Sequence, residues 1–268
     1  MAAPTVRTLS LCSGAGGLDL GVDLALAGRA RAVCYVEREA FAAALLVAGM
    51  EAKALDPAPI WDDLATFGGR AWRGCVDLVL AGFPCPPFSA AGKRLGAADK
   101  RDLWPHVARI VREVGPGFVF LENVRGAVRH PDGLGRWVGE LADLGYSCSW
   151  DVFSAAGVGA PHRRERVFML AYADGRGLEE LGEPERSRIE SERGGLALGC
   201  SHDGPELRAW PPGPDGDWSG VPAEAQPSIR GVADGMASRV DRLRACGNGV
   251  VPLVAAHALR TLAARMTD

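Results

Sequence analysis

Short apolar runs alternate with helix-like stretches from residue 6 to about residue 171 of this 268-residue chain. This alternation limits the fold more than any other feature of the sequence, because strands separated by helices form a mostly parallel sheet with both faces covered. We therefore predict an α/β protein. The predicted strands are 6–12, 32–37, 76–82, 118–124 and 166–172, and the predicted helices are 18–29, 38–50, 103–114 and 136–145.

Residues suited to chemistry follow several of these strands. They lie at 12–17, 37, 83–88 and 122–124, where four of the predicted strands end. Open α/β sheets bind their ligands beyond the carboxyl ends of the strands. The sequence therefore predicts the ligand site at this edge of the sheet.

The composition changes after residue 173. Residues 173–235 are rich in Gly, Pro, Glu and Arg and show little periodicity, whereas the chain ends in a helical pattern. A loop of this length without secondary structure is unusual inside a compact domain. We predict one α/β domain made of residues 1–172 and 236–268, interrupted by a short irregular region at 173–235.

The overall charge gives no support to a nucleic-acid partner, because 30 basic and 33 acidic residues leave a formal net charge of −3. Any such partner would have to bind a local basic patch. The seven cysteines never form a CxxC pair, which favours reduced thiols over disulfides or a zinc site. The first residues lack the pattern of a signal peptide, and no apolar run is long enough to span a membrane. We expect a soluble, intracellular protein without a metal.

The glycine-rich turn CSGAGG follows the first predicted strand. Its glycines allow a sharp turn and the close approach of a ligand to the backbone. A dinucleotide-binding turn would have a further glycine where Asp19 stands, which argues against a nicotinamide-linked oxidoreductase. Glu37 ends the second strand and is placed to accept hydrogen bonds from ribose hydroxyls. A plain tight turn and a helix-capping glutamate are the alternatives.

Cys85 lies between prolines in the segment GFPCPPFS. Prolines restrict the backbone, so this segment is a rigid loop rather than a helix. An ordinary thiol is mostly protonated at neutral pH and must be activated before it can act as a nucleophile. From its surroundings alone, Cys85 is either a structural cysteine or a nucleophile.

Three charged residues follow further along the chain. Glu122 closes the fourth strand, where burial would be costly unless the carboxyl is paired or protonated. Arg164 and Arg166 are two residues apart, so an extended chain would place both on one face. There they would bind a phosphate, a carboxylate or a base carbonyl, or else form a solvated basic patch.

Five segments together, LCSGAGG, GFPCPPFS, ENV, PHRRER and GNGVVP, resemble the motifs of the DNA cytosine-5 methyltransferase family in order and spacing. WDDL and KRDLWPHVARIVREVGP fit two shorter motifs between them. The resemblance is to the bacterial and phage type of this family and covers residues 6–171 and 236–268. It implies a Rossmann-like methyltransferase fold that uses S-adenosylmethionine, with residues 173–235 as a small target-recognition region.

The resemblance also implies a role for each charged or nucleophilic residue. Cys85 would attack C6 of a cytosine flipped out of double-stranded DNA, which activates C5 toward the methyl group. Glu122 would hold N3 and N4 of the base and favour protonation of N3. Arg166 would contact the base carbonyl, and Arg164 would help to order the catalytic loop. Residues 89–101 would be a loop that closes over the base.

The cofactor contacts are implied in the same way. The turn after the first strand would cradle the methionine part, Glu37 would bind the ribose, and Asp63 with Leu64 would contact the adenine. The full implied set is Ser13, Gly14, Ala15, Gly16, Gly17, Leu18, Glu37, Asp63, Leu64, Pro84, Leu103, Asn248 and Val250.

Some positions depart from the family pattern. Cys12 stands where phenylalanine is usual, and Pro86 and His162 stand where glutamine is usual. The short recognition region does not allow a target sequence to be predicted. The implied partners are double-stranded DNA and a restriction endonuclease for the same site, with a monomeric protein in the cytoplasm of a bacterium or a phage-infected cell. Methylation of cytosine in RNA and a non-catalytic DNA-binding relative are the alternatives.

Overall fold

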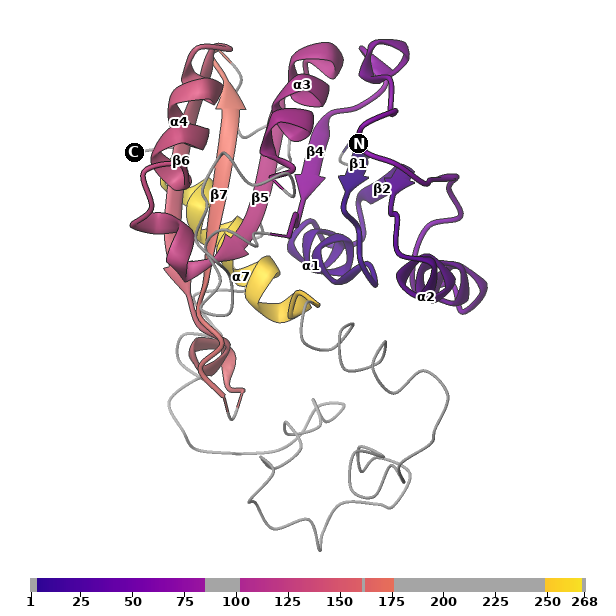
Figure 1. Cartoon of the computed structure of the whole chain (residues 1–268). Helices are drawn as coiled ribbons and strands as arrows, with labels where there is room; N and C mark the ends of the chain where they lie inside the picture. The colour runs from indigo at the N-terminus through magenta and orange to yellow at the C-terminus, as the bar shows by residue number, and fades with distance from the viewer. Residues whose placement is uncertain (1–3, 85–101, 161, 176–248, 267–268) are drawn as a thin grey trace, which may run out of the picture.

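A single seven-stranded sheet organises the described part of the chain (Figure 1). The computed structural model describes residues 4–84, 102–160, 162–175 and 249–266. The strand order is β3-β2-β1-β4-β5-β7-β6. The strands are β1 (Val6–Leu11), β2 (Ala30–Val36), β3 (Ile60–Trp61), β4 (Leu78–Ala81), β5 (Phe118–Val124), β6 (Tyr146–Phe153) and β7 (Arg166–Ala173).

Five α-helices accompany the sheet in the described residues. They are α1 (Gly17–Ala25), α2 (Ala40–Glu51), α3 (Trp104–Val114), α4 (Leu134–Ala142) and α7 (Pro252–Ala264), together with the short 3-10 turns η1 (Gly69–Trp72), η3 (Arg125–Val128) and η4 (Ala155–Val158). Among these helices, none is long and apolar enough to cross a membrane.

The sheet is parallel from β3 to β5 and antiparallel at β7 and β6. Its middle strands carry continuous apolar runs because both of their faces are covered. Successive residues of β4 point to opposite faces. Leu78 and Leu80 pack with α1 and α7, whereas Val79 and Ala81 pack with α3 and α4. The predicted α/β class and mostly parallel sheet are confirmed.

The sequence missed two strands, β3 and β6. β6 reads YSCSWDVF, and only its first and last residues are buried. β6 is the last strand in the sheet order and pairs only with β7. A strand with a single neighbour needs no continuous apolar run. β3 has two residues and is too short to give a periodic signal. The predicted division between residues 1–172 with 236–268 and the region 173–235 stays a prediction, because most of 173–235 lies outside the described residues.

Two glycines let the end of the chain pack closely against α1. A β-carbon at Gly17 would lie 2.4 Å from the carbonyl oxygen of Val250. A β-carbon at Gly21, one turn later, would lie 2.5 Å from the β-carbon of Ala255 and 2.7 Å from the carbonyl oxygen of Pro252. The missing side chains therefore allow residues 250–256 to lie directly on α1, beside the glycine-rich turn.

A Gly21→Ala substitution tests this close packing. We expect it to lower the free energy of unfolding by roughly 1–3 kcal/mol, because an added methyl group would force the two helices apart. Gly139→Ala is the matched control, since Gly139 is also inside a helix and a β-carbon there would meet nothing within 4 Å. That variant should gain up to about 1 kcal/mol from helix propensity alone. Urea denaturation of both variants measures the difference, and equal stabilities would contradict the packing argument.

Candidate functional site

The ends of five strands bring the predicted site residues to one edge of the sheet. β1, β2, β3, β4 and β5 are parallel, so the segments that follow them leave the sheet at the same edge. β7 is antiparallel to β5, so its first residue, Arg166, lies at that edge as well. The topology thus assembles segments that are far apart in the sequence.

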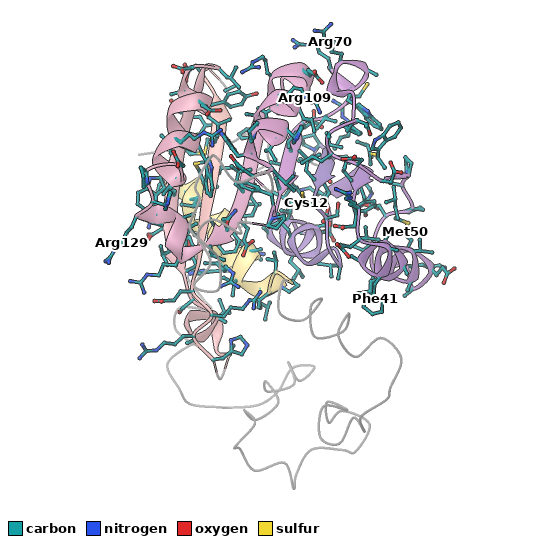
Figure 2. The ribbon with its side chains drawn as sticks, in the orientation of Figure 1. Cys12, Phe41, Met50, Arg70, Arg109 and Arg129 are labelled. Atoms are coloured by element: carbon teal, nitrogen blue, oxygen red, sulfur yellow. The ribbon has the colours of Figure 1, made fainter. Side chains whose placement is uncertain are left out.

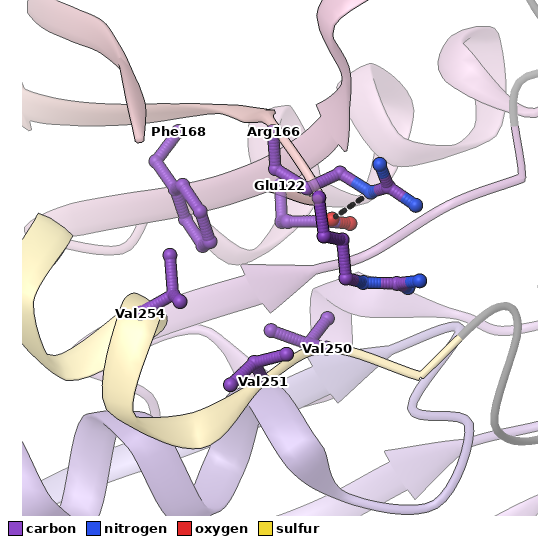
Figure 3. Close-up of a pocket in the computed structure, with 7 residues that line it drawn as sticks. Glu122, Arg166, Phe168, Val250, Val251 and Val254 are labelled. Carbon is purple, nitrogen blue, oxygen red and sulfur yellow. Dashed lines mark ion pairs between the residues drawn. The ribbon is translucent and has the colours of Figure 1, made fainter. Parts of the chain in front are cut away.

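Glu122 and Arg166 form an ion pair at this edge (Figure 3). Glu122 is opposite Phe168 in the β5–β7 register, and Arg166 is two residues from Phe168, so both charged side chains lie on the same face of the sheet. Arg166 Nε lies 3.1 Å from Glu122 Oε1, and the Glu122 side chain is only 8% exposed. The predicted requirement that a buried glutamate be paired or protonated is therefore met by pairing.

Burial nevertheless dominates the protonation of Glu122. Desolvation raises the pKa of Glu122 to about 7, although Arg166 and Arg164 both act to lower it. A carboxyl with such a pKa is divided between its acid and its carboxylate near neutral pH. It can therefore donate a proton or accept one at this site.

Arg164 lines a recess at this edge together with Glu122 and Arg166, but its backbone is not that of a strand. Its φ of 31° is left-handed, so the extended chain that we predicted between the two arginines is wrong, although both line the recess as expected. Arg164 Nη2 donates to the carbonyl oxygen of Gly249 at 2.5 Å, which ties this loop to the returning C-terminal segment. Burial, together with the nearby Arg166, lowers the pKa of Arg164.

Apolar side chains complete the recess around these charges. They are Phe168, Val250, Val251 and Val254, from β7 and from the chain that leads into α7 (Figure 3). Gly82 follows β4 close by, and a β-carbon there would lie 3.8 Å from both Glu122 Oε2 and Val250 Cγ2. The recess thus combines one carboxyl and two guanidinium groups with an apolar wall.

The glycine-rich turn is joined directly to Glu37. The backbone N–H of Gly14 donates to Glu37 Oε2 at 2.7 Å, and the N–H of Glu39 donates to Glu37 Oε1 at 2.8 Å. Glu37 thus connects the ends of β1 and β2 and leads into α2. Its expected contact with a ribose stays a prediction, as does the role of the turn residues Ala15 and Gly16.

Two other residues of the turn point into the protein. Ser13 is buried, and its hydroxyl donates to the carbonyl oxygen of Ser10 at 3.0 Å. Leu18 is 4% exposed and packs in the core beside α7, so it can offer a ligand only its backbone. Gly17 lies directly against Val250. Val250 is the predicted cofactor contact from the C-terminal segment, so this contact is brought to the turn.

The turn after β3 is held in place by α3. Asp63 Oδ1 accepts from the N–H of Ala65 at 2.9 Å, and the carbonyl oxygen of Leu64 accepts from Arg109 Nη2 at 3.0 Å. Arg109, labelled in Figure 2, also donates from Nη1 to the carbonyl oxygen of Phe67 at 2.9 Å. Sequence reasoning missed Arg109, because its partners are backbone oxygens that leave no signature in the sequence.

Asn123 is a second residue that sequence reasoning left without a role. It is 3% exposed, and its Nδ2 donates to the carbonyl oxygen of Phe83 at 3.1 Å. This bond holds the chain immediately before Pro84, which is exposed. Cys85 itself lies outside the described residues, as do Pro86, Asn248 and the segment 89–101. Leu103 is described and packs partly buried against the core at the start of α3.

Asp19 is a buried acid that the sequence marked only as a departure from a dinucleotide motif. Its Oδ2 accepts from the Ser10 hydroxyl at 2.9 Å, whereas Oδ1 is buried without a hydrogen-bond partner among the described residues. Desolvation raises the pKa of Asp19 to about 7, against the lowering effect of the Ser10 bond. Ionised Asp19 is therefore costly to the fold.

The model of the C-5 cytosine-specific DNA methylase family matches residues 6–203. The chain belongs to this family. M.NgoMIV of Neisseria gonorrhoeae, a type II methyltransferase, is 36% identical over 170 residues, which cover 61% of this chain and 51% of that protein. M.CviJI of Paramecium bursaria Chlorella virus IL3A is 36% identical over 166 residues, which cover 62% of this chain and 42% of that protein. The chain spans about half the length of these two curated relatives.

The fold of this family member is also similar to solved structures. A putative DNA modification methyltransferase encoded within an Escherichia coli prophage has a TM-score of 0.52 and 22% identity, over 68% of this chain and 51% of that one. The S. pombe Dnmt2 methyltransferase has a TM-score of 0.51 and 22% identity, over 64% of this chain and 52% of that one. These similarities support the Rossmann-like methyltransferase fold.

An Asp19→Asn substitution tests the cost of the buried acid in this family member. The folded state holds the Asp19 proton more tightly than the unfolded state, so the wild-type protein loses stability as pH rises from about 4 to about 7. Asparagine cannot ionise and still accepts from Ser10. The free energy of unfolding of the variant, relative to wild type, should rise by roughly 1–3 kcal/mol between pH 5 and pH 8. Urea denaturation at both pH values measures it, and a difference that does not change with pH would contradict the raised pKa.

Proposed function

We propose that this chain transfers a methyl group from S-adenosylmethionine to C5 of a cytosine flipped out of double-stranded DNA. The proposal rests above all on the buried Glu122–Arg166 pair, whose carboxyl has a pKa of about 7, in a chain of this family. The activity, substrate and partners of the protein are part of this proposal, because the chain spans only about half the length of its curated relatives.

The proposed reaction begins with the thiolate of Cys85. The sulfur forms a bond to C6 of the cytosine, and the electron pair of the C5–C6 double bond moves toward C5. S-adenosylmethionine would supply an electrophilic methyl group: a bond would form from C5 to the methyl carbon as the bond from that carbon to sulfur breaks, and S-adenosylhomocysteine would be the leaving group. A base then removes the C5 proton, the double bond re-forms and Cys85 leaves C6 as a thiolate.

Glu122 and Arg166 are proposed to carry the charge that develops on the base. Protonated Glu122 donates to N3, which withdraws electrons from C6 and assists attack by sulfur. Its other oxygen accepts from the N4 amino group. Arg166 donates to the base carbonyl, while Arg164 keeps the loop before β7 attached to Gly249. A carboxyl pKa of about 7 makes the required proton available at neutral pH.

The glycine-rich turn fits the cofactor. Gly14 has a φ of 57°, and a β-carbon on it would meet nothing within 4 Å, which leaves open space beside the Gly14–Glu37 hydrogen bond. Cys12 lies at the start of the turn (Figure 2). Burial and the nearby Glu37 raise the pKa of Cys12 to about 12, so this thiol stays neutral and does not compete with C5 for the methyl group. We assign the cofactor to Ser13–Leu18, Glu37, Asp63, Leu64, Pro84, Leu103, Asn248 and Val250.

We place reading of the target sequence in residues 173–235, most of which lie outside the described residues. A cytosine inside a duplex is inaccessible, so the base must leave the stack at a cost of a few kcal/mol. A restriction endonuclease for the same site is the proposed partner in the cell, and we expect the methyltransferase to act as a monomer in the cytoplasm.

Bisulfite sequencing of host DNA tests the proposed activity and identifies the target site. Expression of the wild-type chain should protect cytosines within one recurring sequence, whereas Cys85→Ser should abolish that protection and still bind S-adenosylmethionine. Calorimetric titration with S-adenosylmethionine checks that the variant is folded. Near wild-type methylation by Cys85→Ser would refute the nucleophile, and methylation confined to RNA would refute the choice of DNA.

Glu122→Gln tests the proton that Glu122 is proposed to supply. The glutamine keeps the shape of the side chain but cannot pass a proton to N3, so we expect turnover to fall by at least about 100-fold. Wild-type Glu122 loses its proton as pH rises through about 7, so the ratio of wild-type to variant rates should be largest below pH 7 and should shrink above it.

Asp77→Asn is the matched control for this measurement. Asp77 is also paired with an arginine, Arg7, but it lies at the opposite edge of the sheet. The turnover of the Asp77→Asn variant should stay close to that of the wild type at every pH. A loss below tenfold in Glu122→Gln, or a rate ratio that does not depend on pH, would count against the proposed role.

A further inference from the structure

Three aromatic rings bring together the two points at which the described chain flanks Cys85. The described residues stop at Pro84 and resume at Asp102. The rings of Phe83 and Trp104 lie on either side of this gap, and their centroids are 5.9 Å apart. Both also pack against Trp137 of α4, at centroid distances of 5.1 and 5.7 Å. All three side chains are almost fully buried, so one cluster holds both flanks.

A ring of polar contacts reinforces the second flank. Arg136 of α4 donates to Asp102 Oδ2 at 2.9 Å and to Glu140 Oε1 at 2.8 Å. The other oxygen of Glu140 accepts from the indole N–H of Trp104 at 2.9 Å, and Asp102 Oδ1 accepts from the backbone N–H of Trp104 at 3.1 Å. Arg136, Asp102, Trp104 and Glu140 therefore form a closed ring of hydrogen bonds.

The position of these charges makes the ring stiff. The Asp102 side chain is 11% exposed and that of Arg136 is 23% exposed, so water screens them weakly. Burial alone would lower the pKa of Arg136, but hydrogen bonds to Glu140 and Asp102 raise it. A guanidinium that binds two carboxylates in fixed directions has little freedom to move.

We propose that α4, through Arg136 and Trp137, is a positioning element for the nucleophile segment of this enzyme. The inference rests on the proposed function of Cys85, which is bonded directly to Pro84. Asn123 fixes the Phe83 carbonyl from β5, Trp137 fixes the Phe83 ring, and Arg136 fixes Asp102. None of the motifs that carry the resemblance to the family includes a residue of α4.

The physical reason is the accuracy that attack on C6 requires. A reacting atom displaced by about 1 Å can cost about 100-fold in rate, even when the cause lies far from the chemistry. Because Cys85 is bonded to Pro84, any displacement of Phe83 and Pro84 is passed on to the nucleophile. Anchoring Phe83 and Asp102 to one helix limits such displacement before the substrate binds.

Arg136→Gln tests the proposal against a matched control, Arg265→Gln. Arg265 also pairs with an aspartate, Asp151, between α7 and β6 and away from the aromatic cluster. We expect the single-turnover methylation rate of Arg136→Gln to fall at least tenfold, with an unchanged KM for DNA carrying the site found by bisulfite sequencing. Arg265→Gln should keep the wild-type rate. Arg136→Lys, which can reach one carboxylate, should be intermediate.

Hydrogen exchange supplies a measurement that does not depend on activity. In Arg136→Gln, peptides that cover 78–84 and 102–108 should both exchange faster, while peptides of β1 and β5 stay protected. Faster exchange in 102–108 alone, or a methylation rate equal to that of Arg265→Gln, would overturn the coupling of the two flanks. An inactive wild-type protein would instead overturn the proposed function on which it rests.

Discussion

The antiparallel pairing of β5 with β7 is the constraint on which the candidate site depends. A parallel β7 would begin at the opposite edge of the sheet and would carry Arg166 away from Glu122. Because β7 runs the other way, Arg166 lies opposite Val124, the last residue of β5, and the side chains of Arg166 and Glu122 meet on one face. Because β6 follows β7 in the strand order, β7 has a neighbouring strand on each side.

The returning C-terminal segment joins the recess around Glu122 to the glycine-rich turn. The backbone of Val250 lies against Gly17, and its side chain lies near Gly82 and lines the recess with Glu122. Val250 thus lies beside Gly17 and Gly82, which follow β1 and β4, and lines one recess with Glu122 of β5. The close approach requires glycine at position 17, where a β-carbon would lie 2.4 Å from the Val250 carbonyl oxygen, which explains in steric terms how residues far apart in the sequence come together.

The sequence was sufficient for those parts of the structure that depend on local pattern. The apolar runs predicted five strands, and the strand ends located Glu122, Glu37 and the glycine-rich turn. Contacts between distant segments left no such pattern. Asn123 and Arg109 bind backbone oxygens, and Trp137 packs against other rings. In the sequence, these residues look like any other polar or aromatic residue of a helix or strand. The left-handed backbone of Arg164 was likewise invisible, because arginine has no preference for that conformation.

Two glutamate–arginine pairs show how burial determines the pKa of a paired carboxyl. Glu113 pairs with Arg109 at 3.0 Å and also accepts from the N–H of Gly69. There the hydrogen bonds and Arg109 outweigh desolvation and lower the pKa of Glu113, so it stays a carboxylate that fastens a turn. Glu122 is buried more deeply, and desolvation outweighs the two arginine charges and the hydrogen bond from Arg166, so its pKa rises. The same kind of pair therefore keeps a carboxylate ionised at one place and leaves a carboxyl partly protonated near neutral pH at the other.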